Sequence, residues 1–486
     1  MSPDWLAGWP LLPLSGMLLG GLWRQRALIR DGRFWAVVGL ALLVSAVVMP
    51  LGRHIFDGHE AEYLDIALGR QPLDGGNTYR LPAMQWLYRG LGTVLPFPWA
   101  LQGFVLLCTA LGVGAASSTA ARLVSARVGW ATGITLALWG NLAAWSSSIY
   151  NVALPWALGS VALWGLSLVL DPEEDALGGA LVAGGAAGLA VCFRVEALLL
   201  APVGGLLLLT HGCPRWRHWG LPLFVGLGIA GVSTWVLLSA GLAPGSGERP
   251  LSLYNNMALF IYFEPFQRPW VLPGVLVGLG IGLWERWRVY LPLALGVVLL
   301  HCVMASFNDY ATRHVLNAGL ALSMCLGALS LRRWAWPLLL VAGVGLLVSL
   351  GDLRHRFYAE EELLAQELDP HLPVIGVDEL DPGCALICED TRVVPEGEQR
   401  SHFNLLDPQQ VRQMNDQQGC VLWLYGVQDH RWSSRAVRDR ALRIERLYET
   451  EPVAVVMEPE GGYVALVMRV GQRNKWPRAT PVRKIP

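Results

Sequence analysis

The sequence contains a long series of apolar runs, and these runs restrict the folds that the chain can adopt. We count about twelve before residue 351, each of roughly 15–22 residues, which is near the length that a helix needs to cross a bilayer. Of the 486 residues, 53% are hydrophobic and only 15% are charged, whereas soluble domains carry about 25% charged residues. The sequence therefore predicts an α-helical polytopic membrane protein. The predicted spans are Trp5–Trp23, Phe34–Leu51, Trp99–Ala116, Trp130–Ala144, Asn151–Leu170, Ala176–Phe193, Leu198–Thr210, Trp219–Ala240, Trp270–Trp284, Tyr290–Ser306, Val315–Leu331 and Ala335–Leu350.

Every second connector between these runs is basic, with one exception. The segment Asp171 to Asp175 belongs to the same set and is acidic. The positive-inside rule places the set in the cytoplasm, so the first loop 52–98, the loop 241–269 and the C-terminal segment lie outside. We expect a multi-pass protein of a bacterial inner membrane, with its C-terminal domain in the periplasm or the exterior. The basic connectors contain Arg24, Arg26, Arg30 and Arg33; Arg122 and Arg127; Arg215 and Arg217; Arg286 and Arg288; and Arg332 and Arg333.

The segment after the last run has the composition of a soluble protein. We divide the chain into a membrane domain at 1–351, a small soluble α/β domain at 352–472 and a polar tail at 473–486 that we expect to be disordered. The domain shows no catalytic motif. The pattern predicts strands at Ala385–Cys388, Val421–Tyr425, Pro452–Met457 and Tyr463–Val470, with a helix at Ser433–Tyr448.

Three cysteines lie in this C-terminal domain. Cys388 and Cys420 each adjoin a predicted strand and could form a disulfide in an oxidising compartment. That pairing leaves Cys384 without a partner in the domain.

The first exterior loop carries clustered acids directly after a membrane span. Asp57, Glu60 and Glu62 open a segment whose spacing becomes helical from Glu60 onward. We expect an amphipathic helix at the membrane surface. Acids also suit a helix N-terminus for structural reasons, so a solvated helix start is the alternative. The predicted apolar face contains Ala61, Leu64 and Leu68, with Ile66 and Ala67 beside it.

Further charged residues lie at the exterior ends of other spans. Arginine recognises phosphate with a planar fork of donors, and a nearby carboxylate can take a proton from a hydroxyl group. Charges at membrane depth are costly and usually functional. The alternative is that Arg194 pairs with Glu196 and that Arg313 only extends to the interface. The exterior set contains Arg80, Arg194, Glu196, Asp309, Tyr310, Arg313 and His314.

Three of these segments resemble the GT-C superfamily of glycosyltransferases, in particular bacterial relatives of protein mannosyltransferases and lipid A aminoarabinose transferases. Asp57–Tyr63 (DGHEAEY) resembles the acidic motif of the first loop, although His59 stands where the family usually has Asp. Arg80–Leu87 (RLPAMQWL) resembles a Pro-Leu-aromatic segment, and Arg313–Ala318 (RHVLNA) resembles a conserved span start. The plan of many spans followed by a periplasmic domain also fits.

The resemblance implies inverting transfer of a sugar from a polyprenyl-phosphate donor to an envelope acceptor, which could be a lipid, a glycan or a protein. Asp57 or Glu60 would be the general base, and Arg313 with Arg194 or Arg80 would hold the donor phosphate. Some members use a divalent metal and others none, so a metal at Asp57, His59 and Glu60 stays open. The supporting residues would be His59, Glu62, Tyr63, Glu196, Asp309, Tyr310 and His314.

Two other functional classes remain. A transporter or flippase of a lipid-linked sugar would be favoured by inverted repeats, and we find none in the sequence. A non-catalytic membrane scaffold would not need the clustered acids. A net charge of −1 gives no indication of nucleic-acid binding. The expected partners are a polyprenyl-phosphate sugar donor, an envelope acceptor and membrane lipids.

Overall fold

The computed structural model divides into two compact units, which we describe separately. The first comprises 1–52 and 63–353, and the second comprises 53–62 and 354–486. The predicted boundary after residue 351 stays a prediction. The structure describes residues 9–25, 31–48, 63, 66–69, 82–146, 148–149, 152–194, 197–198, 200–212, 220–223, 225–229, 231, 271–306, 312–367, 373–375, 384–388, 416, 420–426, 448–457 and 464–473.

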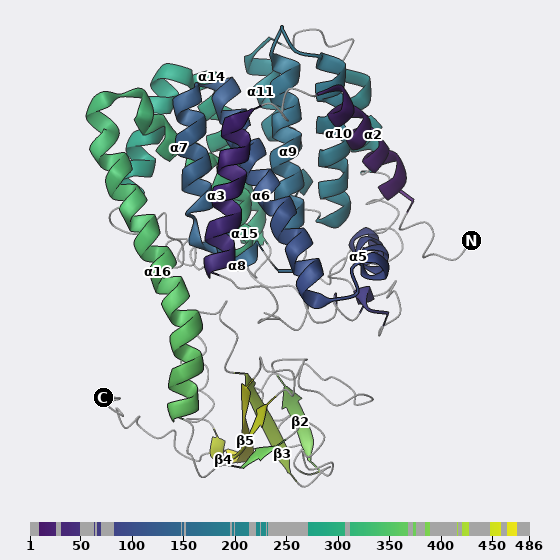
Figure 1. Ribbon diagram of the computed structural model, residues 1–486, viewed down its shortest axis with the longest axis vertical. Coiled ribbons are helices and arrows are strands. Elements are labelled where there is room, and N and C mark those ends of the chain that lie inside the picture. The colour runs from purple at the N-terminus through teal and green to yellow at the C-terminus, as the bar shows by residue number, and fades with distance from the viewer. Residues whose placement is uncertain are drawn as a thin grey trace. The chain divides into compact units, whose positions relative to one another are not determined.

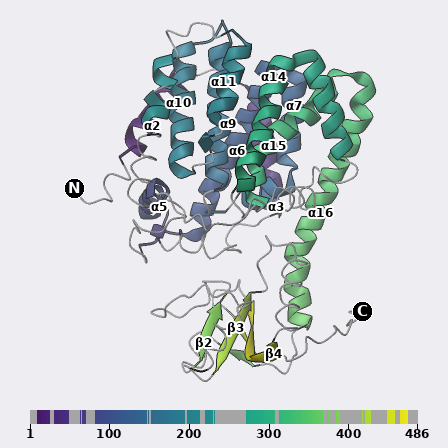
Figure 2. The ribbon, with the colours of Figure 1, turned by 180° about the vertical axis from the view of Figure 1, so that it is seen from behind.

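The first unit is a bundle of helices (Figures 1 and 2). Four helices among the described residues are long and apolar enough to cross a membrane, namely Trp99–Leu123, Ala153–Leu170, Ala176–Phe193 and Arg333–Gly351. The prediction of about twelve spans stays a prediction. The helices are α2 Leu11–Arg24, α3 Gly32–Val48, α5 Pro82–Val94, α6 Pro98–Leu123, α7 Ala126–Ala137, α8 Gly140–Trp145, α9 Ala153–Leu170, α10 Ala176–Phe193, α11 Leu200–Thr210, α14 Leu272–Ser306, α15 Thr312–Ala328, η4 Leu329–Leu331, η5 Arg333–Ala335 and α16 Trp336–Glu367.

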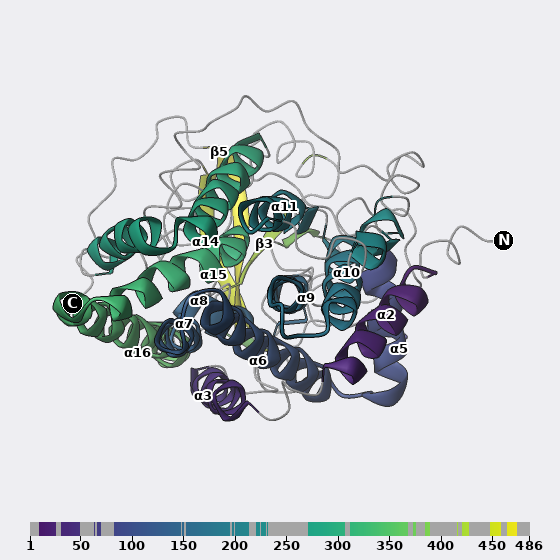
Figure 3. The same cartoon turned by 90° about the horizontal axis from the view of Figure 1, so that it is seen from above.

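Helix α9 lies inside the bundle, between α6 and α10 (Figure 3). Nearly all of its residues are buried, as expected for a helix that is apolar on every face. Gly165 allows α9 and α10 to touch along their backbones, because a Cβ there would lie 2.6 Å from the backbone nitrogen of Ala183. The sequence therefore builds this centre from two apolar helices with small residues between them.

The prediction of one continuous span at Trp130–Ala144 is wrong, because the structure has two helices there. Helix α7 ends at Ala137, and α8 begins at Gly140 after Trp139, which has an extended backbone. The Trp139 side chain is fully buried, and a Cβ added to Gly319 of α15 would collide with its ring. The break thus places a large aromatic ring against α15.

Helix α14 consists of two helices joined at a kink. Arg286 has a non-helical backbone, with φ −141° and ψ 45°. A Cβ on Gly282 would lie 2.5 Å from Cδ1 of Tyr290, although eight residues of straight helix span about 12 Å. The two halves therefore fold toward each other, and the predicted spans Trp270–Trp284 and Tyr290–Ser306 are separate helical segments.

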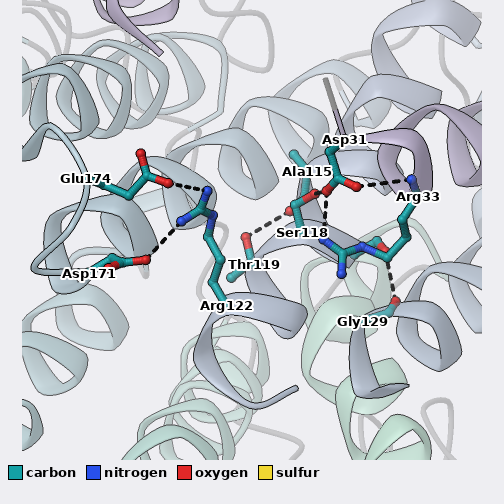
Figure 4. A network of polar contacts seen from close by, with 10 residues as sticks. Asp31, Arg33, Ala115, Ser118, Thr119, Arg122, Gly129, Asp171 and Glu174 are labelled. Atoms are coloured by element: carbon teal, nitrogen blue, oxygen red, sulfur yellow. Dashed lines mark hydrogen bonds and ion pairs between the residues drawn. The ribbon is translucent and has the colours of Figure 1, made fainter. Parts of the chain in front are cut away.

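Ion pairs join several of the connectors that we predicted to be cytoplasmic. Arg122 contacts Asp171 Oδ2 at 3.1 Å and Glu174 Oε1 at 2.7 Å (Figure 4). Arg24 contacts Asp175 at 2.6 Å, so both basic connectors meet the acidic one. The acidic connector that departs from the positive-inside pattern is thus neutralised by its neighbours, and the three connectors share one end of the bundle.

The second unit contains a five-stranded mixed sheet in the order β1-β4-β5-β3-β2. The outer pairs β1–β4 and β2–β3 are parallel, and β5 runs antiparallel to both β4 and β3. Met457 lies opposite Val464, so β4 and β5 form a hairpin at the predicted place. The predicted helix Ser433–Tyr448 lies mostly outside the described residues, and Tyr448 itself begins β4. The strands are β1 Val374–Ile375, β2 Ala385–Cys388, β3 Val421–Gly426, β4 Tyr448–Met457 and β5 Val464–Arg473.

The disulfide of this unit joins Cys384 to Cys420, with a Cα–Cα distance of 4.8 Å. The pairing of Cys388 with Cys420, which the sequence left open, is therefore not the one that forms. The reason is the strand register, because β2 and β3 run parallel with Ala385 opposite Val421. Cys384 and Cys420 each precede their strand by one residue and meet at the same end. Cys388 lies at the other end, opposite Leu424.

Candidate functional site

A cavity that is partly open to the surroundings lies among α9, α11, α14 and α15. In Figure 2 the helices α11, α14 and α15 face the viewer on this side of the bundle. The lining is mainly aliphatic and aromatic, and its polar side chains belong to Arg194 and Ser160. Its residues are Pro155, Trp156, Gly159, Ser160, Leu163, Arg194, Ala197, Leu200, Val203, Leu293, Gly296, Val297, Leu320 and Ala321.

Arg194 reaches the cavity from the end of α10. Its backbone is extended, with φ −157° and ψ 119°, and its N–H donates to the carbonyl of Ala190 at 2.8 Å. The carbonyl of Arg194 accepts from Ala197 N at 3.0 Å, which turns the chain toward α11. Only 7% of the residue is exposed. The guanidinium brings a positive charge and a planar set of N–H donors to the cavity wall, which suits an anionic ligand.

Two glycines of the cavity lining lie close to side chains of α11. Gly159 of α9 faces Leu200, because a Cβ there would lie 3.2 Å from Leu200 Cδ1. A Cβ at Gly296 of α14 would collide with the side chain of Val203 on α11. Larger residues at either glycine would narrow the cavity.

Tyr63 of the first loop is buried in the first unit. Its ring lies 5.5 Å from that of Tyr88 on α5, measured between centroids. Ile66 and Ala67 are also buried, whereas Leu68 is only half-buried. Tyr63, Ile66 and Ala67 have the i, i+3 and i+4 spacing of one helix face. Of the expected apolar face, Ala61 and Leu64 lie outside the described residues.

This segment ends in a turn against α5. Gly69 has φ +79°, a left-handed conformation that favours glycine at a helix end. A Cβ at Gly92 of α5 would collide with the backbone of Ala67. Helix α5 therefore fixes the position of the chain directly after the acidic motif.

The structure places two of the predicted site residues in full, Arg194 in the cavity wall and Tyr63 against Tyr88 of α5. Arg313 and His314 begin α15, and the structure describes their backbone without their side chains. Arg313 precedes Leu320, which lines the cavity, by seven residues. The other predicted residues lie outside the described residues, namely Asp57, His59, Glu60, Glu62, Arg80, Glu196, Asp309 and Tyr310.

The residues of the cavity wall were not predicted from the sequence, apart from Arg194. Trp156 and Ser160 lie one helical turn apart on α9 and both line the cavity. The available signal was the pair of glycines in apolar runs, Gly159 and Gly296. Within the described residues no three His, Cys, Asp or Glu side chains form a group that could hold a metal ion.

Comparisons with known proteins identify the fold. No family model matches the sequence, and no curated protein matches it either. The crystal structure of ArnT from Cupriavidus metallidurans bound to undecaprenyl phosphate aligns with a TM-score of 0.52 at 16% identity, covering 90% of this chain and 97% of that one. The apo structure of the same protein aligns with a TM-score of 0.53 at 16% identity, covering 91% and 98%. The chain therefore shares the fold of ArnT, which is the fold that the resemblance to lipid A aminoarabinose transferases led us to expect.

Proposed function

We propose that this chain, which has a GT-C fold, is a membrane glycosyltransferase that uses a polyprenyl-phosphate-linked sugar. The observation that carries the proposal is the mainly apolar cavity with Arg194 buried in its wall. A polyprenyl phosphate has a long apolar chain and an anionic head, and these match the lining and the arginine respectively. The fold it shares with a protein crystallised with undecaprenyl phosphate supports the same assignment.

In the proposed reaction the sugar moves to a hydroxyl group of an envelope acceptor with inversion. Asp57 or Glu60 takes the proton from the hydroxyl as its oxygen attacks the anomeric carbon. The bond between that carbon and the phosphate oxygen breaks, and the lipid phosphate leaves with an additional negative charge. Arg194, with Arg313 or Arg80, stabilises this charge as it develops.

We place the reaction on the periplasmic side of a bacterial inner membrane. The disulfide between Cys384 and Cys420 supports an oxidising compartment for the C-terminal domain. The ion pairs among Arg24, Arg122 and the acidic connector support a shared end for the connectors assigned to the cytoplasm. Arg194 follows α10 at the opposite end of that helix from Asp175.

The proposal is tested with purified protein in lipid nanodiscs and a radiolabelled polyprenyl-phosphate sugar. We expect transfer of label to an acceptor, and Arg194→Met should slow it by about 10²–10³-fold, the loss typical of a removed charge-stabilising donor. Arg194→Lys should recover part of the rate, because it keeps the charge without the planar fork. Arg127→Gln is the control, since Arg127 is exposed and begins α7, away from the cavity-lining residues.

The same assay separates the other functional classes. Movement of the labelled lipid across the bilayer without transfer would identify a flippase. Binding of the labelled lipid without its movement or transfer would favour a non-catalytic scaffold. A normal rate of transfer by Arg194→Met would show that Arg194 does not take part in the reaction.

A further inference from the structure

The arginines at the predicted cytoplasmic end form two groups that differ in charge balance. In the first group Arg24 pairs with Asp175, Arg33 with Asp31, and Arg122 with Asp171 and Glu174. Ser118 also donates to Asp31 at 3.2 Å (Figure 4). Each arginine of the first group is thus neutralised by carboxylates of the protein.

The second group lies at the kink of α14 and the turn before α16. Arg286 and Arg288 belong to the kink, Arg332 and Arg333 belong to the turn, and all four are exposed. The acid in this group is Glu285, which pairs with Arg332. Within the described residues no carboxylate pairs with Arg286, Arg288 or Arg333. Four arginines against one carboxylate leave a surplus of three positive charges.

The ion pair between Glu285 and Arg332 also fixes the geometry of this group. It joins side chains 47 residues apart in the sequence (332 minus 285) and holds the kink beside the turn. Helices α14 and η4 are in contact as well. The arginines of both segments therefore form one surface, which we call the basic surface.

Exposed tryptophans lie near these arginines in both segments of the sequence. Trp284 is 82% exposed and Trp334 is 66% exposed, and Trp287 and Trp336 are also exposed. The guanidinium carbon of Arg288 lies 5.8 Å from the ring centroid of Trp287. Tryptophan is enriched at the level of lipid headgroups, where one part of the ring is apolar and the N–H meets water. A surface of exposed tryptophan and unneutralised arginine therefore suits a ligand that has both acyl chains and anionic groups.

We propose that the basic surface binds the headgroup of an anionic phospholipid of the cytoplasmic leaflet. Arg286, Arg288 and Arg333 contact the phosphate and any further anionic group, and the tryptophan rings lie along the glycerol and upper acyl chains. Basic pockets between membrane helices on the cytoplasmic side are known to recognise such headgroups. None of its residues lines the Arg194 cavity, and the site does not depend on the proposed transfer reaction.

Lipid retention tests the proposal directly. The full-length protein is assembled in nanodiscs of phosphatidylcholine with a minor fraction of phosphatidylglycerol, and bound phosphatidylglycerol is counted by native mass spectrometry. The triple variant Arg286→Gln, Arg288→Gln and Arg333→Gln should bind this lipid on the order of 100-fold more weakly, because each basic residue near a lipid surface contributes to the attraction. The matched control is Arg24→Gln, Arg33→Gln and Arg122→Gln, which removes equal charge from the neutralised group and should change retention by less than about threefold.

A gain of binding keeps the proposal testable if the triple variant fails to fold. Glu285→Gln removes the acid of the basic surface, and we expect it to bind phosphatidylglycerol about fivefold more tightly. Soluble glycerol phosphate should not displace the lipid. Equal retention by the wild type and the triple variant, no gain with Glu285→Gln, or displacement by glycerol phosphate would each overturn the assignment.

Discussion

Asp175 and Arg24 are 151 residues apart in the sequence, and their side chains form an ion pair with an Nε–Oδ2 distance of 2.6 Å. Asp175 also caps α10, since its Oδ1 accepts from the backbone N–H of Leu177 at 3.1 Å. Partial burial acts to raise the pKa of the Asp175 carboxyl. The hydrogen bond from Arg24 and those from backbone N–H groups outweigh burial, so the pKa lies below its usual value of 3.8.

This pKa predicts how stability depends on pH. A carboxyl whose folded pKa is depressed contributes stability above its unfolded pKa, and the contribution is lost as pH falls through the folded value. We expect Asp175→Asn to unfold more easily than the wild type at about pH 7, by up to about 1 kcal/mol, because both partners are partly exposed. The difference should shrink below about pH 4. Thermal unfolding in detergent across this range measures it, and a difference that does not change with pH would contradict the prediction.

The disulfide predicts which cysteine variants destabilise the C-terminal domain. Cys384→Ser and Cys420→Ser should each cost the domain about 4 kcal/mol, the entropy of a closed loop of this size, because the two cysteines are 36 residues apart. Cys388→Ser is the control and should keep the crosslink. Peptide mapping without reductant and protease sensitivity of the domain are the measurements. A crosslink from Cys388 to Cys420 would show that the strand register is different.

The acids of the first loop should serve the chemistry. We expect Asp57→Asn or Glu60→Gln to leave expression and membrane insertion normal while transfer falls by about 10²–10⁴-fold, the contribution of a general base. Glu62→Gln should be mild, because two residues along a helix point in different directions. His59→Ala should be mild unless His59 binds a metal, in which case a chelator should mimic it. Losses under about tenfold in both acid variants would place the base elsewhere.

The width of the cavity predicts a change in donor binding. Gly296→Leu places a side chain against Val203 in the cavity wall. The apparent KM for the lipid donor should therefore rise, by about tenfold for an overpacked site. Gly280→Leu is the control, since Gly280 is an exposed residue of α14 before the kink, with nothing near its Cβ position. Equal KM values for the two variants would show that the lipid donor does not bind in this cavity.

The orientation of the chain predicts the behaviour of a reporter fused after Asp352. Because α16 follows the basic residues Arg332 and Arg333, the positive-inside rule places its far end outside. An enzyme that is active only in the periplasm should be active in this fusion. If a reporter that works only in the cytoplasm is active instead, the first loop must also be assigned to the cytoplasm. Its acids could then not act at the proposed periplasmic site.

The sequence by itself was sufficient for features that depend on local structure. The predicted run Ala176–Phe193 coincides with α10, and Ala385–Cys388 coincides with β2. A long apolar run satisfies its backbone hydrogen bonds within the helix, and Asp175 caps the helix with its own side chain. The beginning and end of such an element are therefore encoded in neighbouring residues. The GT-C resemblance rested on short motifs, and the fold agrees with it.

Only the tertiary structure decided which distant residues meet. The sequence left open whether Cys388 pairs with Cys420, and the parallel register of β2 and β3 brings Cys384 to Cys420 instead. The acidic connector departed from the positive-inside pattern, and the structure explains it by placing Asp175 beside Arg24. The cavity around Arg194 is likewise built from four helices. Such contacts depend on how whole elements pack and in which register they pair. Residue patterns within a single run specify neither the packing nor the register.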